Sequence, residues 1–289
     1  MPDPGKVLVA IRNATAHFLA TPGRAGSIVT IPSELIDDVL IVGDLHGHVE
    51  VLSSVIRTAA LDTHAQRHLI LQELVHDSRI NPDEGELDRS HRAIDLACAL
   101  TCMFPGRVHY LLGNHELSEL TGRSISKQGH PLNNLFRKGV EADYPSHVGP
   151  LMEAYHALFR ALPLVIKLPN RVVACHTIPD SLSQESLDRD VLTRGDWTEQ
   201  ATRRGGTVYA LTWSRDNSDA AADQFARWID GDLFVCGHQP FEAGFHQSNA
   251  RTLILDGTNP NPTYALFSAQ QRFTIEQLVA STRRVPLNG

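Results

Sequence analysis

The fold is decided by the stretch VLIVGDLHG at residues 39–47. Its four apolar residues in succession predict a short strand that is buried on both faces. Two polar residues, Asp44 and His46, follow as soon as the apolar run ends. In open α/β sheets, ligands bind at the carboxyl ends of the strands. The stretch therefore predicts a buried strand that delivers two polar side chains to a binding site.

Further apolar runs continue this pattern, and helical periodicity separates the early ones. The expected strands are residues 27–31, 39–42, 68–71, 108–112, 164–167, 171–175, 233–236, 252–255 and 264–267. The expected helices are residues 7–19, 49–60, 90–103, 151–161 and 220–230, with Ser90 as an N-cap. The alternation in the first half predicts an α/β fold with a parallel core. Pro169 and Asn170 predict a hairpin between the strands that flank them.

The composition argues against several classes of function. The chain has 26 Lys and Arg against 33 Asp and Glu, and this formal net charge of −7 offers no general attraction to nucleic acid or to an anionic membrane. No apolar run reaches the roughly 18 residues of a membrane-spanning helix, and the N-terminus does not resemble a secretion signal. The four cysteines are too few for a disulfide framework, so we expect a reduced, cytoplasmic protein.

No linker or repeat divides the chain, so we expect a single domain over residues 1–289 with its core at about residues 39–267. Residues 118–150 are rich in Gly, Ser, Asn and Lys. This composition predicts helical pieces and loops, and we expect them to form a cap over a site.

Polar residues follow five of the expected strands. A single histidine after an apolar run is more often a packing residue, but here the pattern recurs in order along the chain, which has 15 histidines in all. Oxygen and imidazole donors of this kind suit Mn, Fe, Zn or Mg better than a structural zinc site. The candidate metal ligands are Asp44, His46, Glu73, Asn114, His176 and His238.

Several of these blocks resemble those of the calcineurin-like metallophosphoesterases. The narrower resemblance is to a bacterial-type variant of the phosphoprotein phosphatase family, which includes the Ser/Thr protein phosphatases. The blocks that carry it are GDLHG at 43–47, QELVHD at 72–77, GNHE at 113–116 and the strands that end at His176 and His238. The resemblance implies a central β-sandwich of mixed sheets flanked by helices.

The resemblance also implies two divalent metal ions, most simply Mn, with Fe, Zn or Mg as alternatives. Asp44 and His46 would bind the first ion, Glu73 would bridge the pair, and the second ion would be bound by Asn114, His176 and His238. Two such cations neutralise a phosphate and acidify a bridging water, which attacks phosphorus in line.

His115 would lie beside the leaving oxygen, where a histidine can supply a proton at neutral pH.

The second block departs most from the family pattern. Gln72 and Glu73 stand where the family has Gly-Asp. Glutamate keeps the carboxylate but adds a methylene, so it can still bridge if the backbone retreats by about 1.5 Å. Gln72 agrees with this, since the close approach that glycine permits is not used.

Two catalytic positions of that block stay open. His76 replaces the aspartate that orients the catalytic histidine in the family, and Asp77 is the alternative if the loop shifts by one residue. The family's arginine is missing there, so Arg79 and Arg215 become the candidates to bind phosphate oxygens. The family's Gly-Gly after the strand that ends at His176 is also missing, so its substrate preference does not carry over.

The leading hypothesis is a metal-dependent phosphatase that hydrolyses phosphomonoesters. Its substrates would be phosphoserine or phosphothreonine, with phosphotyrosine as an additional class. Its partner would be a phosphorylated protein or a small phosphoester. The same metal core could instead cleave the phosphoanhydride of a dinucleoside polyphosphate. A hypothesis from another class is a phosphate-binding scaffold that has lost catalysis through the altered second block.

Overall fold

The computed structural model describes residues 2–258 and 260–287, so the two ends of the expected domain, residues 1 and 289, lie outside the described residues. The strands are β1 (Arg24–Ala25), β2 (Ile28–Thr30), β3 (Asp38–Asp44), β4 (Arg67–Gln72), β5 (Val108–Leu111), β6 (Ser126–Lys127), β7 (His130–Pro131), β8 (Val165–Lys167), β9 (Val172–Cys175), β10 (Leu233–Cys236), β11 (Phe245–Gln247), β12 (Thr252–Leu255), β13 (Thr263–Ser268) and β14 (Thr282–Arg284). The helices are α1 (Pro4–Leu19), α2 (Val49–Ala59), α3 (His91–Met103), α4 (Asn114–Thr121), α5 (Leu132–Asp143), α6 (Val148–Ala161), α7 (Arg189–Arg194), α8 (Glu199–Thr202), α9 (Thr207–Trp213), α10 (Asp219–Ile229) and α11 (Ile275–Ala280).

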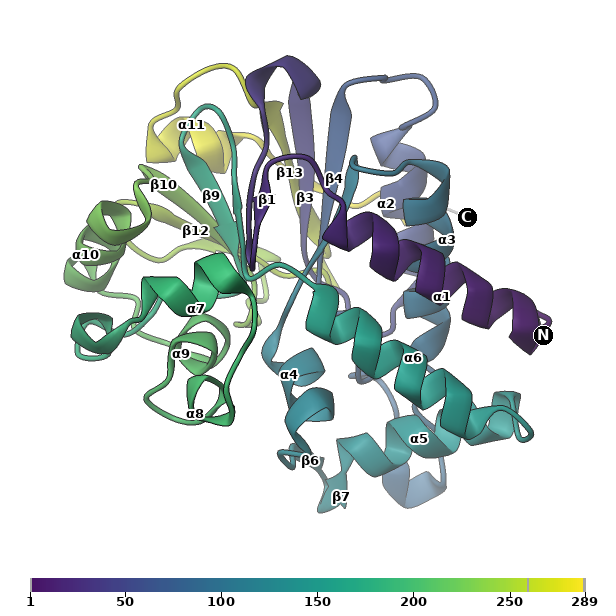
Figure 1. Cartoon of the computed structure of the whole chain (residues 1–289). Coiled ribbons are helices and arrows are strands. Elements are labelled where there is room, and N and C mark those ends of the chain that lie inside the picture. The colour runs from purple at the N-terminus through teal and green to yellow at the C-terminus, as the bar shows by residue number, and fades with distance from the viewer. Residues whose placement is uncertain (1, 259, 288–289) are drawn as a thin grey trace.

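Most of these strands form two mixed sheets that pack face to face (Figure 1). The larger sheet has the order β1-β2-β8-β9-β10-β12-β11 and the smaller one β14-β13-β3-β4-β5. The parallel core expected from the early alternation is present as β3-β4-β5, and β9-β10-β12 form a second parallel set. Antiparallel partners join each set, and β8 and β9 form the predicted hairpin. The expected β-sandwich is thus confirmed.

The uninterrupted apolar runs follow from burial on both faces of each sheet. Val39 and Ile41 pack between the two sheets with Ala174 of the opposite sheet. Their neighbours Leu40 and Val42 point the other way, because side chains alternate along a strand, and join the core beneath the helices. Figure 1 shows α1 and α6 side by side over one flank, and α7 to α10 on the other.

The segment at residues 118–150 forms the end of α4, the β6–β7 ribbon, α5 and the start of α6. Its helix α5 packs against α3 and α6, with Phe136 fully buried. In the ribbon, Lys127 donates to the backbone oxygen of Ser78 in the second block. The segment therefore lies against the loop after β4, and its role as a cap stays a prediction.

Ser90 does not act as the expected cap. It occupies the N-cap position of α3, but its hydroxyl makes no capping bond and instead accepts a hydrogen bond from the backbone N–H of His76, at 3.0 Å. The residue thus fixes a loop of the second block to the start of α3. Within the part of the chain that the structure describes, no helix is both long and apolar enough to span a bilayer.

Candidate metal centre and active site

The carboxyl ends of both parallel sets meet at one edge of the sandwich. There Asp44, the last residue of β3, forms a parallel bridge with Asp256 after β12, which joins the two sheets. The six predicted ligands follow the strands at this edge, and the structure brings all of them together: Asp44, His46, Glu73, Asn114, His176 and His238.

The Asn114 side chain is central to the half of the cluster nearer the larger sheet. Its Oδ1 lies 2.9 Å from Nε2 of His176 and 2.8 Å from Nδ1 of His238. Asn114 begins α4, whereas the two histidines follow the neighbouring strands β9 and β10. One amide oxygen and two imidazoles thus converge from three separate segments.

The Glu73 carboxylate lies between the two halves of the cluster. Its Oε2 is 3.4 Å from Nε2 of His46 and 3.6 Å from Nε2 of His176. Nδ1 of His176 is in turn 3.6 Å from Oδ1 of Asp44. The Glu73 carboxylate therefore lies between His46 and His176, the position that the family resemblance implies for it.

Local backbone conformation makes this convergence possible. His46, Glu73 and His238 have φ values of +37°, +38° and +70°, a region that side chains other than glycine adopt at a cost. Gly237 provides the room for Asp44, because a Cβ at this position would lie only 2.2 Å from the Asp44 Oδ1. Gly113 does the same for Glu73, whose Oε1 would lie 2.7 Å from an added Cβ.

The cluster is buried and suited to cations. Burial raises the pKa of both Asp44 and Glu73, and the Asp44 carboxylate raises that of Glu73 further. Oδ1 of Asp44 and Nδ1 of His176 are buried and have no hydrogen-bond partner among the described residues. Close buried carboxylates with such orphaned atoms are costly unless a positive charge compensates them. The residues present therefore fit a divalent metal site.

The imidazoles are in the form that metals bind. Burial lowers the pKa of His46 to about 4 and that of His238 to about 3, so both rings are neutral at pH 7. Metal binding requires neutral histidine. Among the residues that the structure describes, two triads offer donor atoms within 4.8 Å of one another, namely His46 with Glu73 and His115, and Asp44 with Glu73 and His176.

Of the two candidates in the second block, His76 lies next to His115 and Asp77 does not. Nδ1 of His76 lies 2.9 Å from Nδ1 of His115. Asp77 instead accepts hydrogen bonds from Arg79, at 2.8 and 3.0 Å. The one-residue shift that would place the Asp77 carboxylate on His115 is not found, because the backbone turns at His76 with a φ of +67°.

The two candidate arginines are separated. Arg215 follows α9 and donates through Nε to Nε2 of His238, at 3.2 Å, so its guanidinium lies at the edge of the cluster. Arg79 pairs with Asp77 and with Glu50 at 3.0 Å. The structure thus places Arg215 beside a predicted ligand, whereas Arg79 is engaged elsewhere.

Sequence reasoning gave no role to three acidic residues around the site. The buried Glu116 accepts hydrogen bonds from the backbone N–H groups of Leu74 and Val75 and from the hydroxyl of Tyr110, and so holds the loop after Glu73. Glu119 contacts His76, and Asp256 accepts from the backbone N–H of Phe241. Glu116 lies in the block GNHE, but the backbone groups that it binds are about 40 residues away in sequence.

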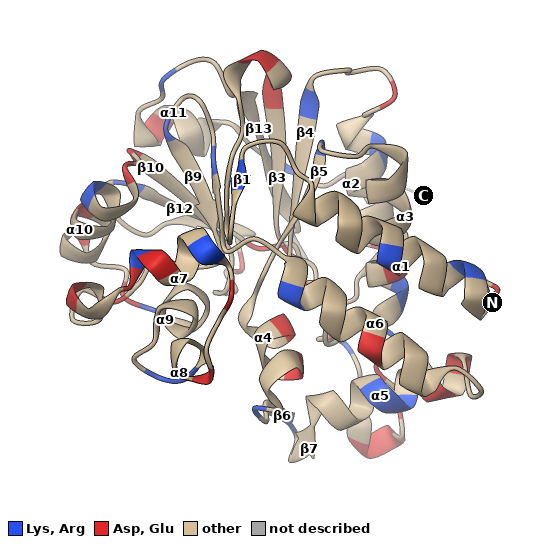
Figure 2. Cartoon of the chain, in the orientation of Figure 1, with Lys and Arg blue, Asp and Glu red and all other residues tan. Residues whose placement is uncertain are grey.

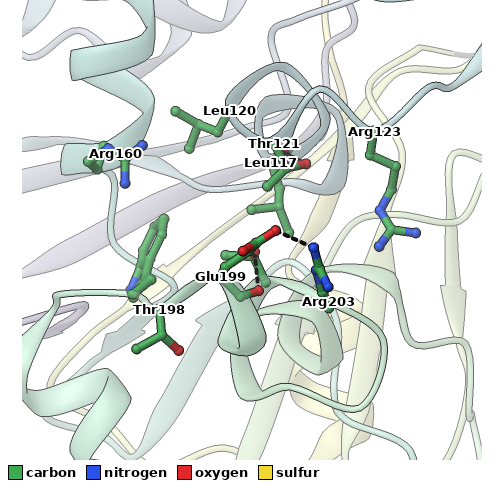
Figure 3. Close-up of a pocket in the computed structure, with 10 residues that line it drawn as sticks. Leu117, Leu120, Thr121, Arg123, Arg160, Thr198, Glu199 and Arg203 are labelled. Carbon is green, nitrogen blue, oxygen red and sulfur yellow. Dashed lines mark hydrogen bonds and ion pairs between the residues drawn. The ribbon is translucent and has the colours of Figure 1, made fainter.

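A separate pocket of about 550 Å³ lies beside the other face of α4 (Figure 3). Three arginines from different segments surround an apolar floor formed by Leu117 and Leu120. Its lining residues are Leu117, Leu120, Thr121, Arg123, Arg160, Trp197, Thr198, Glu199, Thr202 and Arg203. None of the predicted site residues is among them, so this pocket is not the cluster.

Comparison with known proteins agrees with a metal-dependent hydrolase. The family model of the calcineurin-like phosphoesterases matches residues 38–241, which is more than half of the chain. The protein therefore belongs to the calcineurin-like phosphoesterase family. This confirms the predicted family.

Individual relatives are distant. A probable serine/threonine-protein phosphatase of Encephalitozoon cuniculi is 26% identical over 243 residues, which are 74% of this chain but only 45% of that protein. The chain thus spans less than half the length of this relative. A protein serine/threonine phosphatase from Saccharomyces cerevisiae has a similar structure, with a TM-score of 0.66 at 14% identity over 92% of this chain and 82% of that one. A cold-active protein-tyrosine phosphatase of a Shewanella species has a TM-score of 0.52 at 15% identity, over 90% of this chain and 82% of that one. At these identities the structures show the fold alone.

Proposed function

We propose that the protein is a two-metal phosphomonoesterase that removes phosphate from phosphorylated serine or threonine side chains of proteins. The observation that carries the proposal is the convergence of six donor side chains from five strand ends at one edge of the sandwich. The names of the relatives, two serine/threonine phosphatases and a tyrosine phosphatase, favour a phosphorylated protein as the substrate.

The donor set divides naturally between two cations. In this proposal Asp44 and His46 hold the first ion, and the second is held by Asn114 with the histidines of β9 and β10, His176 and His238. Glu73 contacts donors of both halves and would be the ligand shared by the two ions. Bound cations of this kind neutralise phosphate oxygens and lower the pKa of water. Mn²⁺ is the first choice, since it accepts mixed oxygen and imidazole ligands.

The remaining side chains act on the substrate itself. The His115 ring lies next to the cluster, 4.7 Å between centroids from the ring of His46, and in this proposal it delivers a proton to the leaving oxygen. Arg215 lies at the rim, where its fixed fork of donors can bind two phosphate oxygens. Neither role requires any movement of the buried ligands.

The test is turnover by the purified protein after chelation and addition of Mn²⁺. We expect hydrolysis of 4-nitrophenyl phosphate and of phosphoserine or phosphothreonine peptides, and a loss of about 100-fold or more in Asp44→Asn and His115→Asn. The exposed residues Asp62 and His64 provide matched controls, since Asp62→Asn and His64→Asn should keep full activity.

Three outcomes would overturn the proposal. Preferential cleavage of a dinucleoside polyphosphate to nucleotides would identify the phosphoanhydride hydrolase. Tight binding of Mn²⁺ and inorganic phosphate without turnover would identify the scaffold. Faster hydrolysis of phosphotyrosine peptides than of phosphoserine and phosphothreonine peptides would make phosphotyrosine the substrate class instead.

A further inference from the structure

A chain of three side chains leads from the candidate active site into the protein. His115 contacts His76 through the two Nδ1 atoms, at 2.9 Å. Nε2 of His76 lies 2.9 Å from Oε1 of Glu119, which is on the same helix as His115. The proposed mechanism uses only the first of these residues, and it leaves the buried Glu119 unexplained.

The middle member of this chain is held rigidly. Only 1% of the His76 side chain and 3% of the Glu119 side chain are exposed. The backbone N–H of His76 is bound by Ser90, and its ring makes an edge contact with Phe136 at 6.2 Å between centroids. His76 therefore has one orientation available, with one nitrogen toward each partner.

The other oxygen of Glu119 faces His156 of α6, at 3.8 Å. Burial alone would raise the pKa of Glu119, but the nearby His156 imidazole and the hydrogen bond from His76 hold it below the ordinary value. Glu119 is therefore a carboxylate at neutral pH, and a carboxylate can only accept hydrogen bonds.

This acceptor determines where the protons of both imidazoles lie. Because Oε1 of Glu119 accepts, Nε2 of His76 must carry the proton that is donated to it. A neutral His76 then has a bare Nδ1, which accepts from Nδ1–H of His115. The Nε2 of a neutral His115 then carries no proton, so this nitrogen must first take one up before it can donate it to the leaving oxygen.

We propose that Glu119 is a positioning residue that acts through His76 to fix the orientation and tautomer of His115. This inference rests on the proposed phosphatase function. In the family pattern a carboxylate at position 76 contacts the histidine directly. Here the carboxylate lies one side chain further away and comes from α4, so the missing aspartate of the second block is replaced by a histidine and a glutamate acting in series.

The first test compares two leaving groups in the Mn²⁺-loaded enzyme. Glu119→Gln removes the charge but keeps an oxygen that can accept from His76. We expect kcat for a phosphoserine peptide to fall by about 10- to 100-fold with little change in KM, as for other groups that orient an active-site imidazole. We expect a loss below about threefold for 4-nitrophenyl phosphate, whose leaving group needs little protonation. Glu153→Gln, at an exposed position of α6, is the control and should change neither rate.

The second test restores the direct carboxylate. In a His76→Asp variant the aspartate can contact His115 itself, so adding Glu119→Gln should cause no further loss of kcat for the peptide. If Glu119 had a purely structural role, Glu119→Gln would lower kcat equally for the peptide and for 4-nitrophenyl phosphate, or would lower kcat for the peptide by the same factor in wild type and in His76→Asp. Either result overturns the proposal.

A readout independent of turnover separates this proposal from the function on which it rests. In metal-free protein labelled with ¹⁵N-histidine, the ring nitrogen shifts of His115 should show a protonated Nδ1 in wild type and a mixture of tautomers in Glu119→Gln. His115→Asn identifies the signals. Absence of phosphatase activity with this tautomer change would refute the function alone, whereas an unchanged tautomer would refute the positioning role of Glu119.

Discussion

Replacement of Gly237 by alanine tests the geometry of the metal site with a single methyl group. An added Cβ would lie 2.2 Å from Oδ1 of Asp44, 3.0 Å from its Cγ and 3.1 Å from Oε1 of Gln72. Ordinary van der Waals contact begins at 3.4 Å, so the carboxylate oxygen must retreat by 3.4 − 2.2 = 1.2 Å. The backbone itself is not strained by the change, because Gly237 does not have a positive φ.

A displacement of this size moves Asp44 out of reach of a shared cation. We expect Gly237→Ala to weaken Mn²⁺ binding by at least about tenfold, because smaller disturbances of groups around a metal already cost 10- to 100-fold. Overpacking should also lower the free energy of unfolding of the metal-free protein by about 1–3 kcal/mol.

The assay is calorimetric titration of the chelated protein with Mn²⁺, together with thermal unfolding. Gly149→Ala is the matched control, since an added Cβ there meets nothing within 4 Å and the residue lies in α6. Its Mn²⁺ affinity should equal that of wild type. If Gly237→Ala also binds Mn²⁺ within twofold of wild type, Asp44 is not the ligand that this geometry requires.

Three further predictions concern charge and stability. Burial raises the pKa of Asp95 to about 6, above its unfolded value of 3.8, so the folded state holds the proton more tightly. The stability from this group is therefore lost as pH rises from about 4 to about 6, and Asp95→Asn should remove up to about 2 kcal/mol of the change in unfolding free energy between pH 4.5 and pH 7, measured by urea unfolding. Arg215→Ala should lower kcat/KM for 4-nitrophenyl phosphate by about 10- to 100-fold, whereas Arg79→Ala should stay within about threefold, and equal losses would refute the assignment. Mn²⁺ at about 100 times its Kd should stabilise the chelated protein by about 2.7 kcal/mol, and an unchanged unfolding temperature on titration would contradict a site formed only in the folded chain.

The strands of both parallel sets were predictable from sequence because they are buried on both faces, although a parallel arrangement was expected only for the first half. The runs at residues 39–42 and 233–236 consist of consecutive apolar residues, and such runs report burial without knowledge of their neighbours. The short helices α7, α8 and α9 give no comparable signal, since they have 6, 4 and 7 residues and form against the rest of the protein.

The donors of the candidate site were predictable for the same reason, as each follows a strand whose end could be located. The surroundings of His115 were not. Whether His76 or Asp77 faces it depends on the positive φ of His76 and on its contact with Glu119, which is 43 residues away in sequence. Contacts of this kind depend on how α4 packs against the loop after β4, and local pattern carries no information about that.

The charge distribution is likewise visible only in part from composition. Figure 2 shows Lys and Arg spread over many elements of the molecule. The expectation that nucleic acids and membranes are not partners stays a prediction, as does a cytoplasmic location.

The bridge between Asp44 and Asp256 has a consequence for how the site assembles. Donors that precede residue 115 come from the smaller sheet or its loops, and those after residue 175 come from the larger sheet. Each half of the polypeptide supplies only part of the predicted ligand set. Binding of two cations would consequently link one sheet to the other. A chain whose second half has not yet packed against the first would lack a complete binding site for them.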